Sequence, residues 1–146
     1  DVMMGLVERA ATVDTPAAYL SGRIQQFVQE TTRVVPGMLA AIAGADLSVA
    51  AEAMAQSQEL AEEALQNQVP QTRWLAAHAR TLGAAGATAF GAGFGGAVWA
   101  LVTARDATSF AKRWMDAFQR EHRVPAARMR VARVMRPSAG MVRESA

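Results

Sequence analysis

The sequence has no cysteine in its 146 residues, and only one of its 15 basic residues is a lysine. The absence of cysteine excludes a disulfide framework and any metal site that depends on thiolate ligands. It also fits a reducing compartment, so we expect a cytoplasmic protein. Residues 1–10 contain Asp1 and Glu8 and no long apolar core, so they are not a secretory signal. Because the first residue is Asp rather than Met, we expect a piece of a longer protein.

The sequence also lacks a large excess of either charge, since the formal net charge is only +2. Arginines gather in residues 120–143, but no nucleic-acid recognition motif and no interleaved aromatic side chains accompany them. We therefore expect a solvated surface there and no nucleic-acid partner. His78 and His122 are far apart in the sequence, and neither has a paired acid or nucleophile. We predict no metal ligand and no catalytic side chain in this chain.

The first half of the sequence has the apolar spacing of helices. Intervals of three and four predict a helix with one buried face, formed by Leu20, Ile24, Phe27, Val28, Thr31 and Val35. Pro36 predicts that this helix ends or kinks near Val35, with helical structure continuing through Ile42. Gly44 is a natural helix stop, and Asp46 can cap the next helix.

Two more helices are predicted before the glycine-rich region. The first ends before residues 67–71 and buries the stripe Leu47, Ala51, Met54, Gln58, Ala61 and Leu65. The second runs from Thr72 to Thr81, and its residues available to the core are Trp74, Leu75 and Ala79.

Strand patterns follow the helices. The uncharged runs GATAFGAG and AVWALVT are separated by glycines and predict two buried strands joined by a turn. A helix is expected over 108–121, where Phe110, Trp114 and Phe118 recur at intervals of four and belong in the core. Residues 127–135 alternate as a half-exposed strand does. This order predicts an α+β fold, in which helices cover one face of an antiparallel sheet.

The stretch 81–104 contains no charged residue, although six glycines fall within 83–96. Its length would suffice for a membrane span. However, it is mostly Gly and Ala, and so many glycines disfavour a helix. We therefore expect no membrane partner.

Gly91, Gly93 and Gly96 match G-x-G-x-x-G, which occurs in two kinds of nucleotide-binding loop. A dinucleotide-binding turn leads into a helix, but a strand is predicted here. A protein-kinase glycine loop needs a lysine on a following strand, and Lys112 falls on a predicted helix. A hairpin remains, whose glycines let the backbone approach a ligand or another domain. A tight turn without any ligand is an equally open alternative.

The residues AFGAGFGGAVWALV at 89–102 resemble the third conserved motif of the GHMP kinases, whose usual form is close to LTGAGFGGC before a hydrophobic strand. The closest resemblance is to galactokinases, and it covers the chain from about Tyr19 to Met141. The other similar segments are the helix–turn–helix stretch 23–65, residues 67–87, and RPSAGM at 136–141, which resembles a Pro-Ser-x-Gly-Ala ending.

This resemblance implies the C-terminal domain of an ATP-dependent kinase that phosphorylates a small-molecule hydroxyl, such as that of a sugar. The implied fold is ferredoxin-like, with residues 1–18 as an N-terminal connecting segment and 19–146 as the domain. The family's serine-rich phosphate loop, sugar-binding signature and catalytic Asp belong to an N-terminal domain and are absent from this sequence. ATP and magnesium are therefore implied for the full-length protein, whereas this fragment is expected to bind neither and to be inactive alone.

The resemblance also implies the site residues, which line the cleft through their backbone: Phe90, Gly91, Ala92, Gly93, Phe94, Gly95 and Gly96. Their implied role is close packing beside the phosphates and the substrate, without proton transfer. Three positions depart from the usual family pattern. Phe90 replaces a Thr, Thr88 stands where a basic or long residue is common, and Ala97 replaces a frequent Cys.

The implied partners are the N-terminal kinase domain of the same chain and a sugar-like small molecule. An isolated fragment is expected to expose the apolar surface on which that domain docks, and to form a homodimer through it. Because Phe90 removes a hydroxyl near the phosphates, an alternative function stays open. In that alternative the protein is a non-catalytic sugar or nucleotide sensor, or an interaction module, with the kinase fold.

Overall fold

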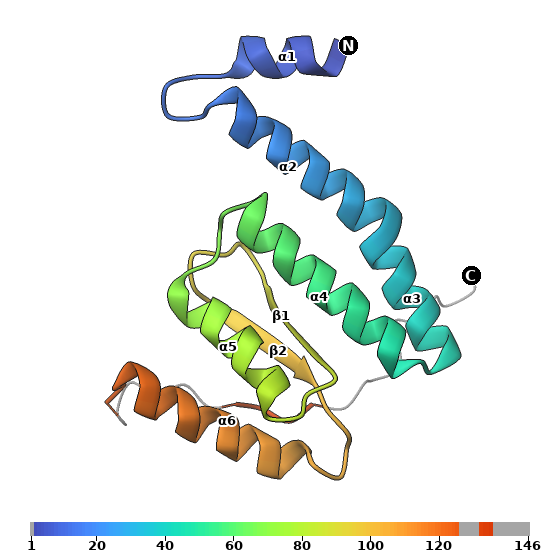
Figure 1. Cartoon of the computed structure of the whole chain (residues 1–146), viewed down its shortest axis with the longest axis vertical. Coiled ribbons are helices and arrows are strands. Elements are labelled where there is room, and N and C mark those ends of the chain that lie inside the picture. Colours follow the sequence, from blue (N-terminus) through green and yellow to red (C-terminus); the bar gives the residue numbers. More distant parts are fainter. Residues whose placement is uncertain (1, 126–131, 136–146) are drawn as a thin grey trace, which may run out of the picture. The chain divides into compact units, whose positions relative to one another are not determined.

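The computed structural model describes residues 2–125 and 132–135. The chain divides into two compact units, and the boundary in the sequence falls between Leu101 and Val102. The first unit contains α1 (Val2–Ala10), α2 (Ala17–Gln29), the π-helical segment η1 (Glu30–Val34), α3 (Val35–Gly44), α4 (Leu47–Glu63), α5 (Pro70–Thr81), β1 (Gly86–Phe90) and β2 (Ala97–Leu101) (Figure 1). The second contains α6 (Ala107–His122). The predicted α+β class is confirmed, because helices pack against an antiparallel sheet.

A π-helical turn resolves the conflict between Pro36 and the surrounding helical sequence. Proline has no N–H, and its ring clashes with the carbonyl four residues earlier in a regular helix. The wider turn of η1 accommodates this, so α2, η1 and α3 follow one another as one long helix (Figure 1). The hydroxyls of Thr31 and Thr32 donate to the carbonyl of Val28, at 3.2 and 2.6 Å. The predicted interruption near Val35 is therefore a change of helical turn and not a helix end.

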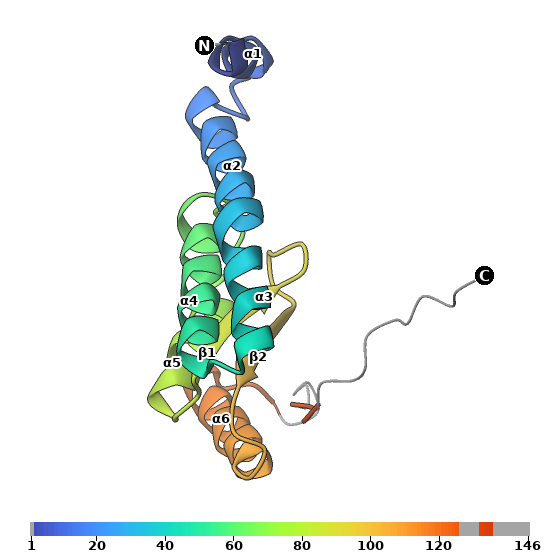
Figure 2. The same ribbon diagram turned by 90° about the vertical axis from the view of Figure 1, so that its right-hand side faces the viewer.

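The long helix lies beside α4 in both views of the molecule (Figures 1 and 2). The chain reverses after Gly44, where Ala45 adopts a left-handed conformation with φ 51°. Asp46 then caps α4 as predicted, because its Oδ1 accepts from the backbone N–H groups of Ser48 and Val49 at 2.9 and 3.2 Å. A core cluster forms between the two helices from Val34, Ala53 and Leu60, with Met38 packed against it.

The two predicted strands form a hairpin, in which Gly86 pairs with Leu101 and Phe90 pairs with Ala97. β1 packs against both α4 and α5. The contact with α4 is close enough to require glycine at its start, because a Cβ on Gly86 would lie 2.9 Å from Met54 Sδ and 3.1 Å from Ala51 Cα. Met54 is itself only 1% exposed, so it forms the centre of this contact.

Two burial predictions are wrong. In the long helix, Phe27, Val28 and Val35 were expected in the core but are 66%, 49% and 46% exposed. The helix turns its neighbouring face towards α4 instead, and the buried residues there are Val34 and Ala41. The second error concerns β2, which was expected to be buried. It is partly exposed, because in the described residues only β1 pairs with it.

The predicted helix 108–121 is confirmed as α6, in which Phe110 and Trp114 are buried with ring centroids 5.4 Å apart. Phe118 is half-buried. Most of the predicted strand 127–135 lies outside the described residues, and the described part, 132–135, has no strand. No helix in the described ranges is long and apolar enough to cross a membrane.

Candidate functional site

The segment from the last residue of β1 to the residue before β2, residues 90–96, is termed the glycine loop. Its backbone is left-handed at five positions, with φ values of 95°, 84°, 57°, 117° and 96° at Gly91, Gly93, Phe94, Gly95 and Gly96. Left-handed conformations cost little for glycine and are uncommon for other residues. The many glycines of this segment therefore allow the backbone to adopt these left-handed conformations.

Asn67, in the connection between α4 and α5, holds the loop in place. Its carbonyl oxygen accepts a hydrogen bond from the N–H of Phe94. Its side-chain Nδ2 donates to the carbonyl of Ala92 at 3.3 Å. A Cβ on Gly93 would lie 2.5 Å from both the side chain and the backbone of Asn67. Position 93 therefore needs glycine for two reasons, its positive φ and this close contact.

The loop presents backbone donors rather than side-chain chemistry. In the part of the chain that the structure describes, Phe94 has the one N–H in residues 91–96 that bonds to a backbone carbonyl. Among the described residues no such acceptor exists for the other N–H groups, at Gly91, Ala92, Gly93, Gly95 and Gly96. No residue of the loop is charged. Successive N–H groups around left-handed turns can form a concave site for an anion.

The three positions that depart from the usual family pattern lie in different surroundings. Phe90 is 59% exposed at the end of β1, and Ala97, its partner in β2, is also exposed. Thr88 is buried at 4% exposure, and its hydroxyl donates to Gln58 Oε1 at 3.2 Å. The same oxygen accepts from the N–H of Ala89 at 2.8 Å. The hydrogen bond of Thr88 with Gln58 therefore joins β1 to α4.

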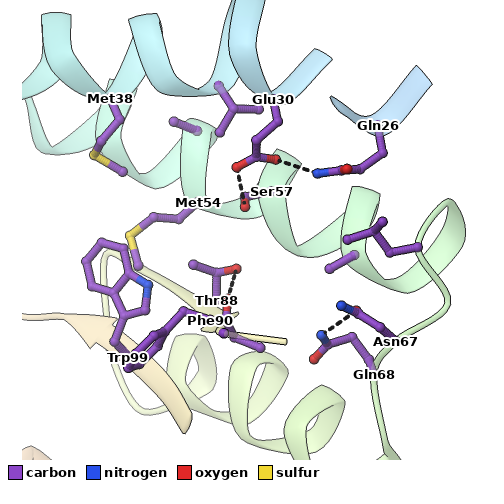
Figure 3. Close-up of a pocket in the computed structure, with 16 residues that line it drawn as sticks. Gln26, Glu30, Met38, Met54, Ser57, Asn67, Gln68, Thr88, Phe90 and Trp99 are labelled. Atoms are coloured by element: carbon purple, nitrogen blue, oxygen red, sulfur yellow. Dashed lines mark hydrogen bonds between the residues drawn. The ribbon is translucent and has the colours of Figure 1, made fainter. Parts of the chain in front are cut away.

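A cavity of about 400 Å³, here called the hairpin pocket, lies next to the glycine loop within the first unit. Side chains from the long helix, α4, the connection after α4, and both strands line it. Figure 3 shows Glu30 and Ser57 on one side of the pocket, Phe90 and Trp99 on the opposite side, and Asn67 and Gln68 at one end. Of the predicted loop residues, this pocket includes only Phe90 and Gly91.

A polar network lies along the helical side of the pocket. The Glu30 carboxylate accepts from Ser57 Oγ at 3.1 Å and from Gln26 Nε2 at 3.4 Å. At the end of the pocket, Gln68 Nε2 donates to Asn67 Oδ1 at 2.8 Å. The opposite side is apolar and aromatic, with Trp99 39% exposed.

Sequence reasoning missed most of these residues. Glu30 and Asn67 lie in segments that resemble the family, 23–65 and 67–87, but neither the resemblance nor the apolar spacing assigned them a role. Trp99 was assigned to a buried strand, although it is 39% exposed and lines the pocket. No signal in one sequence marks Asn67 as the loop's anchor, because the contact joins residues 25 positions apart.

The surroundings of the hairpin pocket contain a further cavity among the described residues. A second cavity, of about 580 Å³, lies between α4 and α5 and contains none of the predicted site residues. In the described residues no group of three or more His, Cys, Asp or Glu side chains could hold a metal ion.

Comparison with known families gives one result that fits this hairpin and its helices. The family described as GHMP kinases C terminal matches residues 38–120, which is more than half of the chain. The matched range begins in α3 and includes α4, α5, both strands and the glycine loop. No curated protein matches the chain. The extent of the family match shows that this chain belongs to the GHMP kinase C-terminal family.

Proposed function

We propose that the protein is the C-terminal domain of an ATP-dependent sugar kinase most similar to galactokinases, and that the glycine loop forms one wall of its active-site cleft. Family membership supports a GHMP-type kinase. The observation that carries the proposal further is the row of loop N–H groups with no backbone acceptor in the described residues, held in shape by Asn67. These groups suit the oxygens of a phosphate.

In this proposal ATP supplies the phosphoryl group, and the chain contributes positioning and electrostatic stabilisation. The N–H groups of Gly91, Gly93 and Gly95 would face the negative charge that spreads over the transferring phosphate. No group in residues 90–96 can take up the proton of the substrate hydroxyl, because the loop has no ionisable side chain. The base and the ligands for magnesium therefore belong to the N-terminal kinase domain of the same protein, and this chain is inactive without it.

An exposed apolar surface supports the presence of such a partner. Five side chains of the long helix form what we call the apolar helix face: Phe27, Val28, Val35, Leu39 and Ile42. Their exposed fractions range from 46% to 69%. Clusters of this kind are usually covered by another domain or subunit. In the isolated chain the same surface would favour a homodimer. The lack of cysteine in the sequence supports, as part of this proposal, a reducing compartment such as the cytoplasm.

A second candidate function follows from Phe90. A phenyl ring that is 59% exposed stands where a hydroxyl is usual, so the cleft lacks one hydrogen-bonding group. This favours, as the alternative, a sensor or interaction module that binds a sugar or nucleotide without turnover.

The test uses the full-length protein that contains this chain. ATP consumption is measured with galactose and a panel of other sugars, for the wild type and for Gly93→Ala. A kinase should consume ATP with at least one sugar, and Gly93→Ala should lower the rate because it displaces the loop. Sugar or nucleotide binding without ATP consumption would support the sensor instead. The absence of a serine-rich phosphate loop and a catalytic Asp from the preceding part of the protein would overturn the kinase proposal.

A further inference from the structure

The hairpin pocket has a single ionisable side chain in its lining, Glu30. The carboxylate of Glu30 accepts hydrogen bonds from two neutral groups, the Gln26 amide and the Ser57 hydroxyl. Among the described residues no cationic side chain pairs with it. A carboxylate that is partly withdrawn from water is stabilised best by a charge-assisted hydrogen bond from a cation. The helical side of the pocket therefore carries the negative charge of Glu30, which no cationic side chain of the described residues pairs with.

The end of the pocket offers another acceptor. Gln68 Oε1 is buried and has no hydrogen-bond partner in the described part of the chain. The amide nitrogen of Gln68 is already engaged, because it donates to Asn67 Oδ1. A buried carbonyl oxygen without a donor is unfavourable, so a turn of the Gln68 side chain that brings this oxygen to a ligand donor gains an interaction. Both polar groups, the Glu30 carboxylate and Gln68 Oε1, thus favour a ligand that donates hydrogen bonds.

The opposite side of the pocket suits the body of an organic cation. The aromatic rings of Phe90 and Trp99 are 59% and 39% exposed, and both line the cavity (Figure 3). Aromatic faces pack well against an alkyl group, and the thioethers of Met38 and Met54 extend this apolar lining. A volume of about 400 Å³ lies within the usual range of small-molecule sites.

From these three features we propose that the hairpin pocket binds a small organic cation of the primary alkylammonium class. The ammonium group donates to Glu30, and the alkyl body lies against Phe90 and Trp99. A neutral sugar is a poorer match, since it leaves the carboxylate without a counter-charge. This proposal goes beyond the kinase function, and it requires no contribution from another domain.

The first experiment compares two ligands of similar shape on the 146-residue chain. The probes are 3-methylbutylammonium chloride and its neutral counterpart 3-methylbutan-1-ol, with potassium chloride as the salt control. Binding is followed by calorimetry and by the indole N–H resonance of Trp99 in NMR spectra. We expect the ammonium ion to bind in a saturable way and at least about tenfold more tightly than the alcohol, because only the ion forms a charge-assisted bond.

A pair of matched variants then assigns the effect to the pocket. Glu30→Gln keeps an acceptor for Ser57 but removes the charge, so it should weaken binding of the ammonium ion by about tenfold or more and leave the alcohol unchanged. Glu52→Gln, an exposed glutamate of α4 outside the pocket, should change neither. Circular dichroism checks that the variants fold, and Trp99→Leu provides an independent variant on the opposite side of the pocket that should also weaken binding.

Three results would overturn the proposal: no binding of the ammonium ion, equal affinity for ion and alcohol, or ion binding that Glu30→Gln leaves unchanged. Saturable binding of galactose that competes with the ion would instead assign the pocket to a sugar. None of these measurements involves ATP turnover. Failure here therefore leaves the kinase proposal intact, and an inactive full-length protein leaves this one intact.

Discussion

α4 and the long helix formed by α2, η1 and α3 both carry apolar residues at helical spacing, but they use them differently. α4 buries Ala50, Ala53 and Met54 against its neighbours. The long helix leaves Leu39 and Ile42 62% and 69% exposed. Apolar spacing predicts that a helix has an apolar face. It does not decide which face is buried when a helix is apolar on two sides.

The π-helical turn adds a second reason for this difference. A π-helical turn closes i→i+5 hydrogen bonds, so it contains more residues than an α-helical turn. Residues after Val34 are therefore rotated relative to the positions that a regular period would give them. The last residue of the predicted stripe, Val35, lies after this turn and consequently missed the core, whereas Phe27 and Val28 precede the turn.

The largest effect is expected where the two helices differ most in burial. Met54→Ala should lower the free energy of unfolding of the chain by about 2–5 kcal/mol, because it leaves a cavity against Gly86 and β1. Leu39→Ala, on the apolar helix face, should cost less than about 0.5 kcal/mol at concentrations where the chain is monomeric. Urea denaturation of both variants measures the contrast. Equal losses would mean that the apolar helix face is packed in solution.

The second effect separates two glycines of the same loop. Gly93→Ala and Gly96→Ala both place alanine at a positive φ, which costs on the order of 1 kcal/mol. Only Gly93→Ala also brings a Cβ against Asn67, whereas nothing lies within 4 Å of a Cβ at Gly96. Gly93→Ala should therefore destabilise the loop by at least about 1 kcal/mol more.

Hydrogen exchange of the Phe94 N–H provides the readout, because this group is bonded to Asn67 O. Exchange should accelerate more in Gly93→Ala than in Gly96→Ala. Similar acceleration in the two variants would show that Asn67 does not hold the loop, and would remove the anchor from the proposed phosphate site.

Local signals in the sequence predicted the elements well. Gly44, Asp46 and the glycine-separated runs gave the helix stop, the cap and the hairpin, because each depends on the conformational preferences of a few adjacent residues. The hairpin pocket could not be predicted in this way. Glu30 meets Ser57 across 27 positions, and Asn67 meets Ala92 across 25. Such contacts depend on how helices pack, which one sequence does not specify.

The cap of α4 provides a third, smaller effect. Asp46→Ala removes the acceptor for two backbone N–H groups and should cost about 1 kcal/mol of unfolding free energy. Asp46→Asn should cost much less, because the amide oxygen can still accept. Thermal denaturation at neutral pH compares the two variants. A loss in Asp46→Asn as large as in Asp46→Ala would mean that charge, and not the cap geometry, sets the effect.

The smallest effect on stability should coincide with a clear effect on association. Phe27→Ser combined with Ile42→Ser replaces two exposed side chains of the apolar helix face, so stability should change by less than about 0.5 kcal/mol per site. If this face mediates the expected homodimer, each side chain contributes about 1.5–3 kcal/mol when buried, and dimerisation should weaken at least about tenfold.

Val13→Ser, at an apolar residue 97% exposed outside this face, is the control. Sedimentation equilibrium measures all three proteins. A wild-type chain that stays monomeric at every concentration would remove the dimer, and a dimer that the double variant leaves unchanged would assign the contact to another surface.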